Sequence, residues 1–333
     1  MKTQIYATFG PSCKDIKTLK KMVENGLCGM RLNLSHLSLP CAKEYIDNYR
    51  QAAKEFGTDI HLLIDMQGPE LRVGDTEDIV LECGMYYNNI PLPAEVISSI
   101  EEGDKVLFDD GKLLCTVTKE KSFYVIRGGL LKAHKSVKVE GKDIKMPCLT
   151  EHDIKNIRHA KEYGVTAIMQ PFVRDAQDIM NVRAVLRENG AEGLKILAKT
   201  ENRIAVENLK SIVKEADGIV IARGDLGNDM PLWELPGVQK QIEEACKNAN
   251  KPYIVVTQML ASMENSPVPT RAEVSDIFHA VYHGAFGVMI TGESAIGKYP
   301  VEAVKYLAKT AENAEFLRRS KADSDSFINA KTE

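Results

Sequence analysis

Two carboxylates, Glu201 and Asp225, each follow a short apolar run, and the two runs are neighbours along the chain. One or two carboxylates together with substrate oxygens and water are the ligands that Mg²⁺ prefers. The sequence therefore suggests a divalent-metal pair. A structural alternative remains open, because Lys199 and Arg223 stand close enough in sequence to neutralise these carboxylates in salt bridges.

Glycines on both sides of Asp225, Gly224 and Gly227, would let a ligand approach the backbone closely. Free N–H groups at such a turn can bind a carboxylate or a phosphate. The motif is short, and its weight comes from the possible metal pair beside it.

Three further residues, Asn33, Ser35 and Asp65, supply hard oxygens with a single negative charge. This set is too weak for a tight divalent site but suits a loosely held monovalent cation. A plain polar hydrogen-bond cluster is the alternative. Arg31 and Lys199 are cations that could hold a phosphoryl group during its transfer.

The elements that must position these residues form a repeating pattern. Eight short apolar runs alternate with amphipathic stretches, as expected for parallel strands that are buried on both faces. The predicted strands are Gln4–Phe9, Met30–Leu34, His61–Met66, Ala167–Phe172, Leu194–Thr200, Gly218–Ala222, Pro252–Thr257 and Gly287–Thr291. The predicted helices include Lys14–Asn25, Pro40–Phe56, Ala176–Asn189, Ile204–Glu215 and Trp233–Asn248, with capping boxes at Thr150/Asp153 and Thr270/Glu273 and a last helix from Pro300.

This alternation predicts the α/β class, in the form of a (β/α)₈ TIM barrel. Barrel active sites lie at the C-terminal ends of the strands. Six of the eight predicted strands end in polar or charged residues, with acids and bases interleaved. This pattern favours a functional site over strand ends that are polar only because they are exposed to solvent.

Residues 71–145 interrupt the pattern with short strands and glycine turns, among them Lys105–Phe108, Leu113–Val117 and Ser122–Ile126 followed by Gly128 and Gly129. We expect hairpins in a small β-barrel-like lid domain, inserted after the third strand. Its 75 residues, taken from 333, leave 258 for residues 1–70 and 146–319 and the tail, close to the ~250 of a bare barrel. Residues 320–333 are expected to form a loose polar tail.

Composition limits the possible partners. The chain has 43 Lys and Arg against 47 Asp and Glu, a formal charge of −4, so no basic field favours nucleic acid or a membrane surface. The seven cysteines form no CxxC pair, and we expect reduced thiols in a cytoplasmic protein.

Taken together, the motifs resemble the pyruvate kinase family, in the order in which that family carries them. The resemblance rests on Met30-Arg31-Leu32-Asn33-Leu34-Ser35-His36, Asp65-Met66-Gln67-Gly68-Pro69-Glu70, Lys199-Thr200-Glu201-Asn202, Ala222-Arg223-Gly224-Asp225-Leu226-Gly227, Thr257-Gln258-Met259-Leu260 and Pro269-Thr270-Arg271-Ala272-Glu273. It implies transfer of a phosphoryl group from phosphoenolpyruvate to ADP, giving pyruvate and ATP, under a β domain that closes as a lid.

The resemblance also implies roles for individual residues. Glu201 and Asp225 would hold Mg²⁺ (or Mn²⁺), and Lys199 and Arg31 would stabilise the phosphoryl group. The K⁺ ligands would be Asn33, Ser35, Asp65 and the carbonyl of Met66, and Glu70 matches K⁺-dependent members. Gly224, Asp225 and Thr257 would bind the pyruvate carboxylate, and Thr257 lies where the enol carbon is protonated. The residues facing the nucleotide would be Pro11, His36, Arg72 and Lys135.

Several positions depart from the family pattern. Gln170-Pro171-Phe172 replaces a Ser-Phe pair, Ile296 replaces a lysine, and Met66-Gln67 replaces Thr-Lys. The C-terminal effector-binding domain of most members is not expected, so neither is a response to a sugar phosphate; a homodimer through the barrel helices is possible. Two alternatives stay open: a metal-dependent aldolase or lyase of the same barrel type, and a weakly active binding or regulatory paralogue.

Overall fold

The computed structural model describes residues 2–35, 37–69, 71–109, 111–142, 144 and 146–329, with 321–329 described by their backbone. His36 and Glu70, both among the predicted ligand-facing residues, lie outside these ranges. The chain divides into two compact units, Met1–Gly68 with Leu149–Glu333, and Pro69–Cys148.

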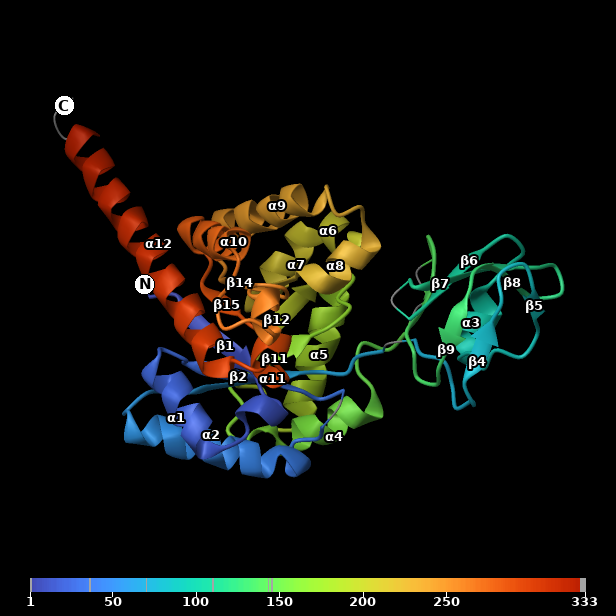
Figure 1. The fold of residues 1–333 in the computed structure, drawn as a ribbon, viewed down its shortest axis with the longest axis horizontal. Coiled ribbons are helices and arrows are strands. Elements are labelled where there is room, and N and C mark those ends of the chain that lie inside the picture. Colours follow the sequence, from blue (N-terminus) through green and yellow to red (C-terminus); the bar gives the residue numbers. More distant parts are fainter. Residues whose placement is uncertain are drawn as a thin grey trace. The chain divides into compact units, whose positions relative to one another are not determined.

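Within the first unit, eight described parallel strands close a barrel (Figure 1). Around the barrel the order is β1-β15-β14-β13-β12-β11-β3-β2. The strands are β1 (Gln4–Thr8), β2 (Gly29–Asn33), β3 (His61–Asp65), β11 (Ala167–Gln170), β12 (Lys195–Thr200), β13 (Gly218–Ala222), β14 (Tyr253–Val256) and β15 (Gly287–Met289). The predicted strands and the TIM-barrel class are therefore confirmed.

Apolar strand residues fill the barrel interior. One buried cluster includes Tyr6, Leu63, Met169, Leu197 and Met289, each from a different strand. All five residues of β13 are buried, which explains why its sequence is continuously apolar rather than alternating. Polar side chains are consequently concentrated where the strands end.

Helices follow the strands. They are α1 (Ile16–Glu24), α2 (Lys43–Glu55), α4 (Glu151–Ala160), α5 (Ala176–Glu188), α6 (Arg203–Glu207), α7 (Leu209–Glu215), α8 (Arg223–Asp229), α9 (Leu235–Asn248), α10 (Arg271–Tyr282), α11 (Gly292–Ala295) and α12 (Pro300–Asn329), with 3₁₀ turns η1 (Pro11–Cys13), η2 (Pro40–Ala42) and η3 (Ala261–Glu264). Both predicted capping boxes are present, at the starts of α4 and α10. In the described part of the chain, no helix is long and apolar enough to cross a membrane.

Three helical predictions need correction. The helix predicted over Ile204–Glu215 is broken at Asn208, where the backbone leaves helical geometry (φ −94°, ψ 10°) and the side-chain amide donates to the carbonyl of Arg174. The Arg223–Gly227 motif, for which no helix was predicted, begins helix α8. The expected loose tail is wrong as far as Asn329, because α12 continues through residues that include no glycine or proline to stop it.

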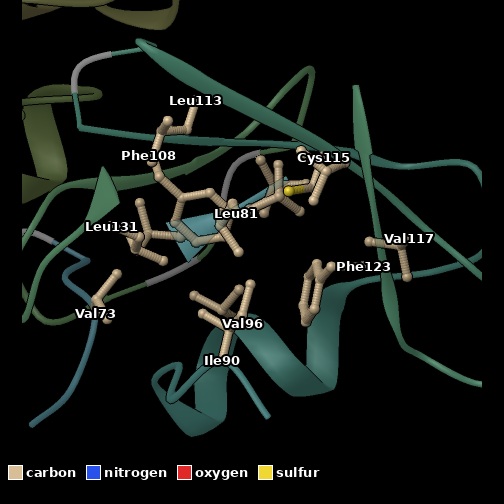
Figure 2. Packing of buried hydrophobic residues seen from close by; sticks show 14 of the residues in the cluster. Val73, Leu81, Ile90, Val96, Phe108, Leu113, Cys115, Val117, Phe123 and Leu131 are labelled. Atoms are coloured by element: carbon tan, nitrogen blue, oxygen red, sulfur yellow. The ribbon is translucent and has the colours of Figure 1, made fainter. Parts of the chain in front are cut away.

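The second unit contains two sheets and one helix. A five-stranded sheet has the order β10-β6-β7-β8-β5 and a two-stranded sheet pairs β4 with β9. The elements are β4 (Ile79–Leu81), β5 (Tyr86–Tyr87), α3 (Ala94–Ser99), β6 (Lys105–Phe108), β7 (Leu113–Val117), β8 (Phe123–Arg127), β9 (Gly129–Leu131) and β10 (Val137–Val139). Phe108, Phe123 and Val96 pack in its own apolar core (Figure 2), so it is a separately packed domain.

One of its two predicted hairpins is confirmed. Strands β6 and β7 pair antiparallel across the turn that contains Asp109 and Gly111. The hairpin expected at Gly128 and Gly129 is wrong, because β9 leaves the sheet of β8 and pairs with β4. The backbone of Leu81 passes so close that a Cβ on Gly128 would lie 2.2 Å from its carbonyl oxygen.

Candidate active site

Lys199, near the C-terminal end of β12, places its ammonium group between two buried carboxylates. Its Nζ lies 2.6 Å from Glu201 Oε1 and 3.2 Å from Asp65 Oδ1. The side chains of Asp65 and Glu201 are only 3% and 1% exposed. Glu201 therefore does form the ion pair with Lys199 that the sequence left open as an alternative. The same carboxylate is one of the two predicted metal ligands.

Arg31, on β2, binds the other side of the Asp65 carboxylate. Its Nη2 and Nε lie 2.6 Å and 2.7 Å from Asp65 Oδ2, and its Nη1 donates to Thr8 Oγ1 at 3.2 Å. One carboxylate thus bridges both predicted phosphoryl-binding cations and fixes where their positive charge lies.

Burial and neighbouring charges set the protonation of this cluster. Burial raises the pKa of Glu201 to about 7, with a further contribution from the charge of Asp225 and an opposing one from Lys199. Burial also disfavours the charged forms of Asp65 and Lys199, but their mutual attraction outweighs it. The pKa of Asp65 is therefore lowered and that of Lys199 is raised.

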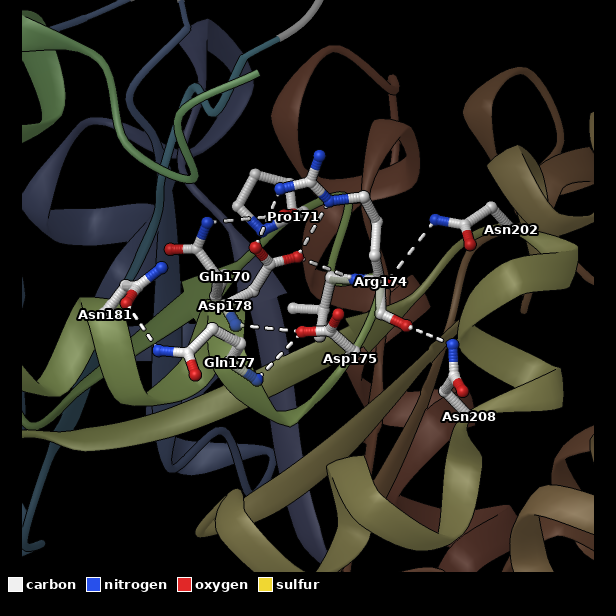
Figure 3. A network of polar contacts seen from close by, with 10 residues as sticks. Gln170, Pro171, Arg174, Asp175, Gln177, Asp178, Asn181, Asn202 and Asn208 are labelled. Carbon is white, nitrogen blue, oxygen red and sulfur yellow. Dashed lines mark hydrogen bonds and ion pairs between the residues drawn. The ribbon is translucent and has the colours of Figure 1, made fainter. Parts of the chain in front are cut away.

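The loop after β11 closes one side of the cluster. Phe172 donates its backbone N–H to Glu201 Oε2 at 2.8 Å, in a left-handed conformation with φ of 52°. Figure 3 shows the polar network behind this loop: Arg174 forms a two-point contact with Asp178, and Asn208 donates to the carbonyl of Arg174. The loop is therefore held by α5 and by the α6–α7 junction.

The predicted substrate-binding residues come together at the start of α8. Gly224 and Asp225 occupy its first turn, where backbone N–H groups have no helical acceptor, and the helix has no side-chain cap. A Cβ on Gly224 would lie 2.9 Å from Thr257 Cγ2, so the glycine allows Thr257 to pack against this turn. The first turn of α8, whose N–H groups lack helical acceptors, therefore lies against the Thr257 side chain.

Thr257 and Gln258 follow β14 with φ values of 74° and 55°. Positive φ is strained for a β-branched residue, and such strain is concentrated at functional sites. Arg223 Nη2 donates to the Thr257 carbonyl at 2.8 Å, while its Nη1 pairs with Asp276 at 2.7 Å. Arg223 is thus paired with Asp276 and supports the strained backbone of Thr257.

The predicted monovalent-cation residues are neighbours in the sheet. Asn33 on β2 is in register with Asp65 on β3, and Ser35 donates its N–H to Asn33 Oδ1 at 3.0 Å. Met66 follows Asp65 directly, and its N–H donates to the Met169 carbonyl, which anchors the strand end. The side chains of Asn33, Ser35 and Asp65 and the backbone of Met66 therefore lie at the neighbouring C-terminal ends of β2 and β3.

The predicted nucleotide-facing residues are divided between the two units. Pro11 begins η1 directly after β1 in the first unit. In the second unit, Lys135 forms an ion pair with Asp109 at 2.8 Å and Arg72 Nη1 donates to the His134 carbonyl at 2.7 Å.

Other supporting residues were missed or misread in the sequence. Asp153 of the α4 capping box also accepts the N–H groups of Gln67 and Gly68, and so fixes the loop after β3. Glu293, which follows the predicted strand Gly287–Thr291, is buried and accepts the N–H groups of Leu260 and Thr291. The capping-box spacing was the sequence feature that could have pointed to the role of Asp153. No feature of the sequence points to the role of Glu293.

The candidate divalent site contains two carboxylates and no more. Among the described residues, no three His, Cys, Asp or Glu side chains gather as a metal cluster. Glu201 Oε1 and Asp65 Oδ1 are buried without a hydrogen bond of good geometry from the described residues. Such a donor set fits an ion that takes its remaining ligands from a substrate and water.

Comparisons with known proteins agree with this geometry. A family model described as "Pyruvate kinase, barrel domain" matches residues 1–89 and 82–304. Proteins named pyruvate kinase from Bacillus licheniformis, Aeropyrum pernix and Leishmania mexicana are 36%, 35% and 35% identical to this chain, over 94%, 93% and 94% of it and 57%, 70% and 67% of their own lengths. The chain spans only a little over half of the first of these relatives. The chain belongs to the pyruvate kinase family.

Proposed function

We propose that this chain catalyses phosphoryl transfer between phosphoenolpyruvate and ADP, giving pyruvate and ATP. The observation that carries the proposal is the buried ammonium group of Lys199 between Glu201 and Asp65, beside the open first turn of α8. Phosphoryl transfer needs alignment and concentrated positive charge more than covalent help from the protein.

The chain's cations would stabilise the phosphoryl group. Lys199 and Arg31 both point at Asp65, so their charges are fixed about one carboxylate. Because their donors are already oriented, they would stabilise charge on a phosphoryl group without reorganising. Asp65 would act by holding the two cations in place.

The start of α8 would bind the substrate's carboxylate. The N–H groups of Gly224 and Asp225 and the hydroxyl of Thr257 lie on one surface that suits an anion. Arg223 would keep Thr257 in its strained conformation, and the Thr257 hydroxyl would guide a proton to or from the methylene carbon of the enol.

Glu201 and Asp225 fit a divalent cation such as Mg²⁺ or Mn²⁺, because the charge of Asp225 acts on Glu201 and the buried Glu201 Oε1 has an ion pair with Lys199 but no hydrogen bond of good geometry from the described residues. When bound, such an ion would neutralise charge on the phosphoryl oxygens. Asn33, Ser35, Asp65 and the Met66 carbonyl would hold K⁺, and Pro11, His36, Arg72 and Lys135 would contact the nucleotide. No disulfide joins any of the cysteines that the structure describes, which supports a cytoplasmic location.

The test is pyruvate formation from phosphoenolpyruvate and ADP by the purified chain, with and without Mg²⁺ and K⁺. We expect turnover that requires Mg²⁺ and rises with K⁺. Glu201→Gln should lower the rate on the order of 10²–10³-fold, whereas Glu207→Gln, an exposed carboxylate six residues away, should not change it. Absence of turnover under every condition would refute the proposed activity, and equal rates without K⁺ would refute only the K⁺ site.

A further inference from the structure

A cavity lies at the end of the barrel opposite the candidate active site, where the strands begin. It has a volume of about 760 Å³ and opens beside the starts of β1 and β14 and the ends of α9 and α10. Its size is within the range of sites for small organic ligands, roughly 300–1,000 Å³. Nothing in the proposed reaction uses this end of the barrel.

Cations dominate the wall of this cavity. Lys2, Lys247, Lys251 and Arg318 line it, and none of the described lining residues is acidic. Such a local excess of positive charge favours an anionic ligand.

Two of these four cations bind backbone carbonyl groups of the described residues, and the other two do not. Lys251 Nζ donates to the carbonyls of Ala216 and Lys214, and Arg318 Nη1 donates to the Val281 carbonyl. By contrast, the ammonium groups of Lys2 and Lys247 form no ion pair with any carboxylate that the structure describes. Two lysines at the cavity therefore have no structural partner within that part of the chain.

Two buried hydroxyl groups at the cavity are also unsatisfied. Tyr253 and Thr3 are 3% and 5% exposed, both line the cavity, and neither Tyr253 Oη nor Thr3 Oγ1 has a hydrogen-bond partner among the described residues. Buried polar groups are nearly always paired, and an unpaired one destabilises the fold. A ligand atom that accepts hydrogen bonds would satisfy both.

One of these hydroxyls lies beside a cation. A Cβ built on Gly284 would be 3.6 Å from Arg318 Nη1 and 3.9 Å from Tyr253 Oη, so both atoms border the same glycine. Among the described residues, Arg318 donates a hydrogen bond to the Val281 carbonyl, although a guanidinium group carries five N–H donors. A positive charge and one unsatisfied hydroxyl group therefore lie close together in the wall of the cavity.

We propose that this cavity binds a small organic molecule carrying a phosphate or carboxylate group. Lys2, Lys247 and Arg318 would contact the acid group, and the hydroxyls of Tyr253 and Thr3 would donate to it or to a neighbouring oxygen. Phe286, which also lines the cavity, would contact the apolar part of the molecule. The site is separate from the proposed catalytic residues.

Calorimetric titration of the full chain tests this site, with phenyl phosphate and benzoate as the two acidic probes and benzyl alcohol as the neutral one. We expect an acidic probe to bind and the neutral probe not to bind; the stronger of the two acids identifies the preferred group. Lys247→Gln should weaken binding by about tenfold, the loss of one charged hydrogen bond. Lys240→Gln, an exposed lysine on the same helix, should leave it unchanged.

Two further variants separate this site from the catalytic one. Tyr253→Phe removes only the unsatisfied hydroxyl, so it should weaken binding severalfold without lowering the melting temperature. Lys199→Met should leave binding intact. The proposal is overturned if neither acid binds at millimolar concentration, if binding is unaffected by both Lys247→Gln and Tyr253→Phe, or if it is lost in Lys199→Met alone.

Discussion

Asp65→Asn should destabilise the barrel strongly, because it removes one charge from a buried group of four. Asp65 is 3% exposed and contacts both Arg31 and Lys199, so its loss leaves Lys199 paired with Glu201 alone and removes the carboxylate that Arg31 contacts. Removing one partner of a buried ion pair typically costs about 3–5 kcal/mol. Asparagine keeps the size of the side chain, so packing should contribute little to the loss.

The chain offers a matched control on its surface. Asp47 also contacts one lysine and one arginine, Lys43 and Arg50, but its side chain is 48% exposed. Exposed pairs contribute about 0–1 kcal/mol, so Asp47→Asn should have a small effect.

The measurement is urea unfolding followed by far-UV circular dichroism, since the single tryptophan, Trp233, is 83% exposed and would report poorly on the core. We expect the midpoint to fall much further for Asp65→Asn than for Asp47→Asn. Equal small losses would refute the reasoning that Asp65 holds the two cations in a buried network.

Three further predictions concern packing, pH and thiol exposure. Gly10→Ala should lower stability by about 1–3 kcal/mol or more, because its Cβ would lie 2.3 Å from the Ala295 carbonyl oxygen, while Gly193→Ala, with open space around it, should change the melting temperature little. Burial raises the pKa of Glu273, but hydrogen bonds from Ser262 and Thr270 outweigh it and leave that pKa lowered. Its stabilisation should thus be complete above its unfolded pKa of about 4.3 and lost as the pH falls through the lower folded value, so that acid melts of wild type and Glu273→Gln converge. Burial raises the pKa of the Cys246 thiol to about 12, so at pH 8 a thiol reagent should label the exposed Cys41 rapidly and Cys246 only after unfolding; equal rates would contradict the burial.

Strand positions were predictable because each barrel strand has an apolar centre and polar residues gather at or just beyond its C-terminal end. The helix at Arg223–Asp229 was not, because its two glycines favour a turn and only the neighbouring contacts of the strand ends stabilise a helix there. The pairing of β9 with β4 depends on strands far apart in the sequence, which local turn signals do not specify.

In the candidate site, too, some features could be predicted from the sequence and others could not. Residue types and strand order were enough to bring Lys199, Glu201 and Asp65 to one rim. The role of Arg223 was not visible, because its contacts with Thr257 and Asp276 depend on backbone conformation and on a helix more than fifty residues away. Long-range positioning of this kind has no periodic signature in a sequence.

The most direct test of the central claim compares Lys199→Met with Lys195→Met in pyruvate formation from phosphoenolpyruvate and ADP. Both lysines are on β12, but Lys195 is exposed at the far end of the strand. The proposed role of Lys199 predicts a loss on the order of 10²–10³-fold for Lys199→Met in a variant whose circular dichroism shows it to be folded, and an unchanged rate for Lys195→Met. A folded Lys199→Met variant that keeps the wild-type rate would contradict it.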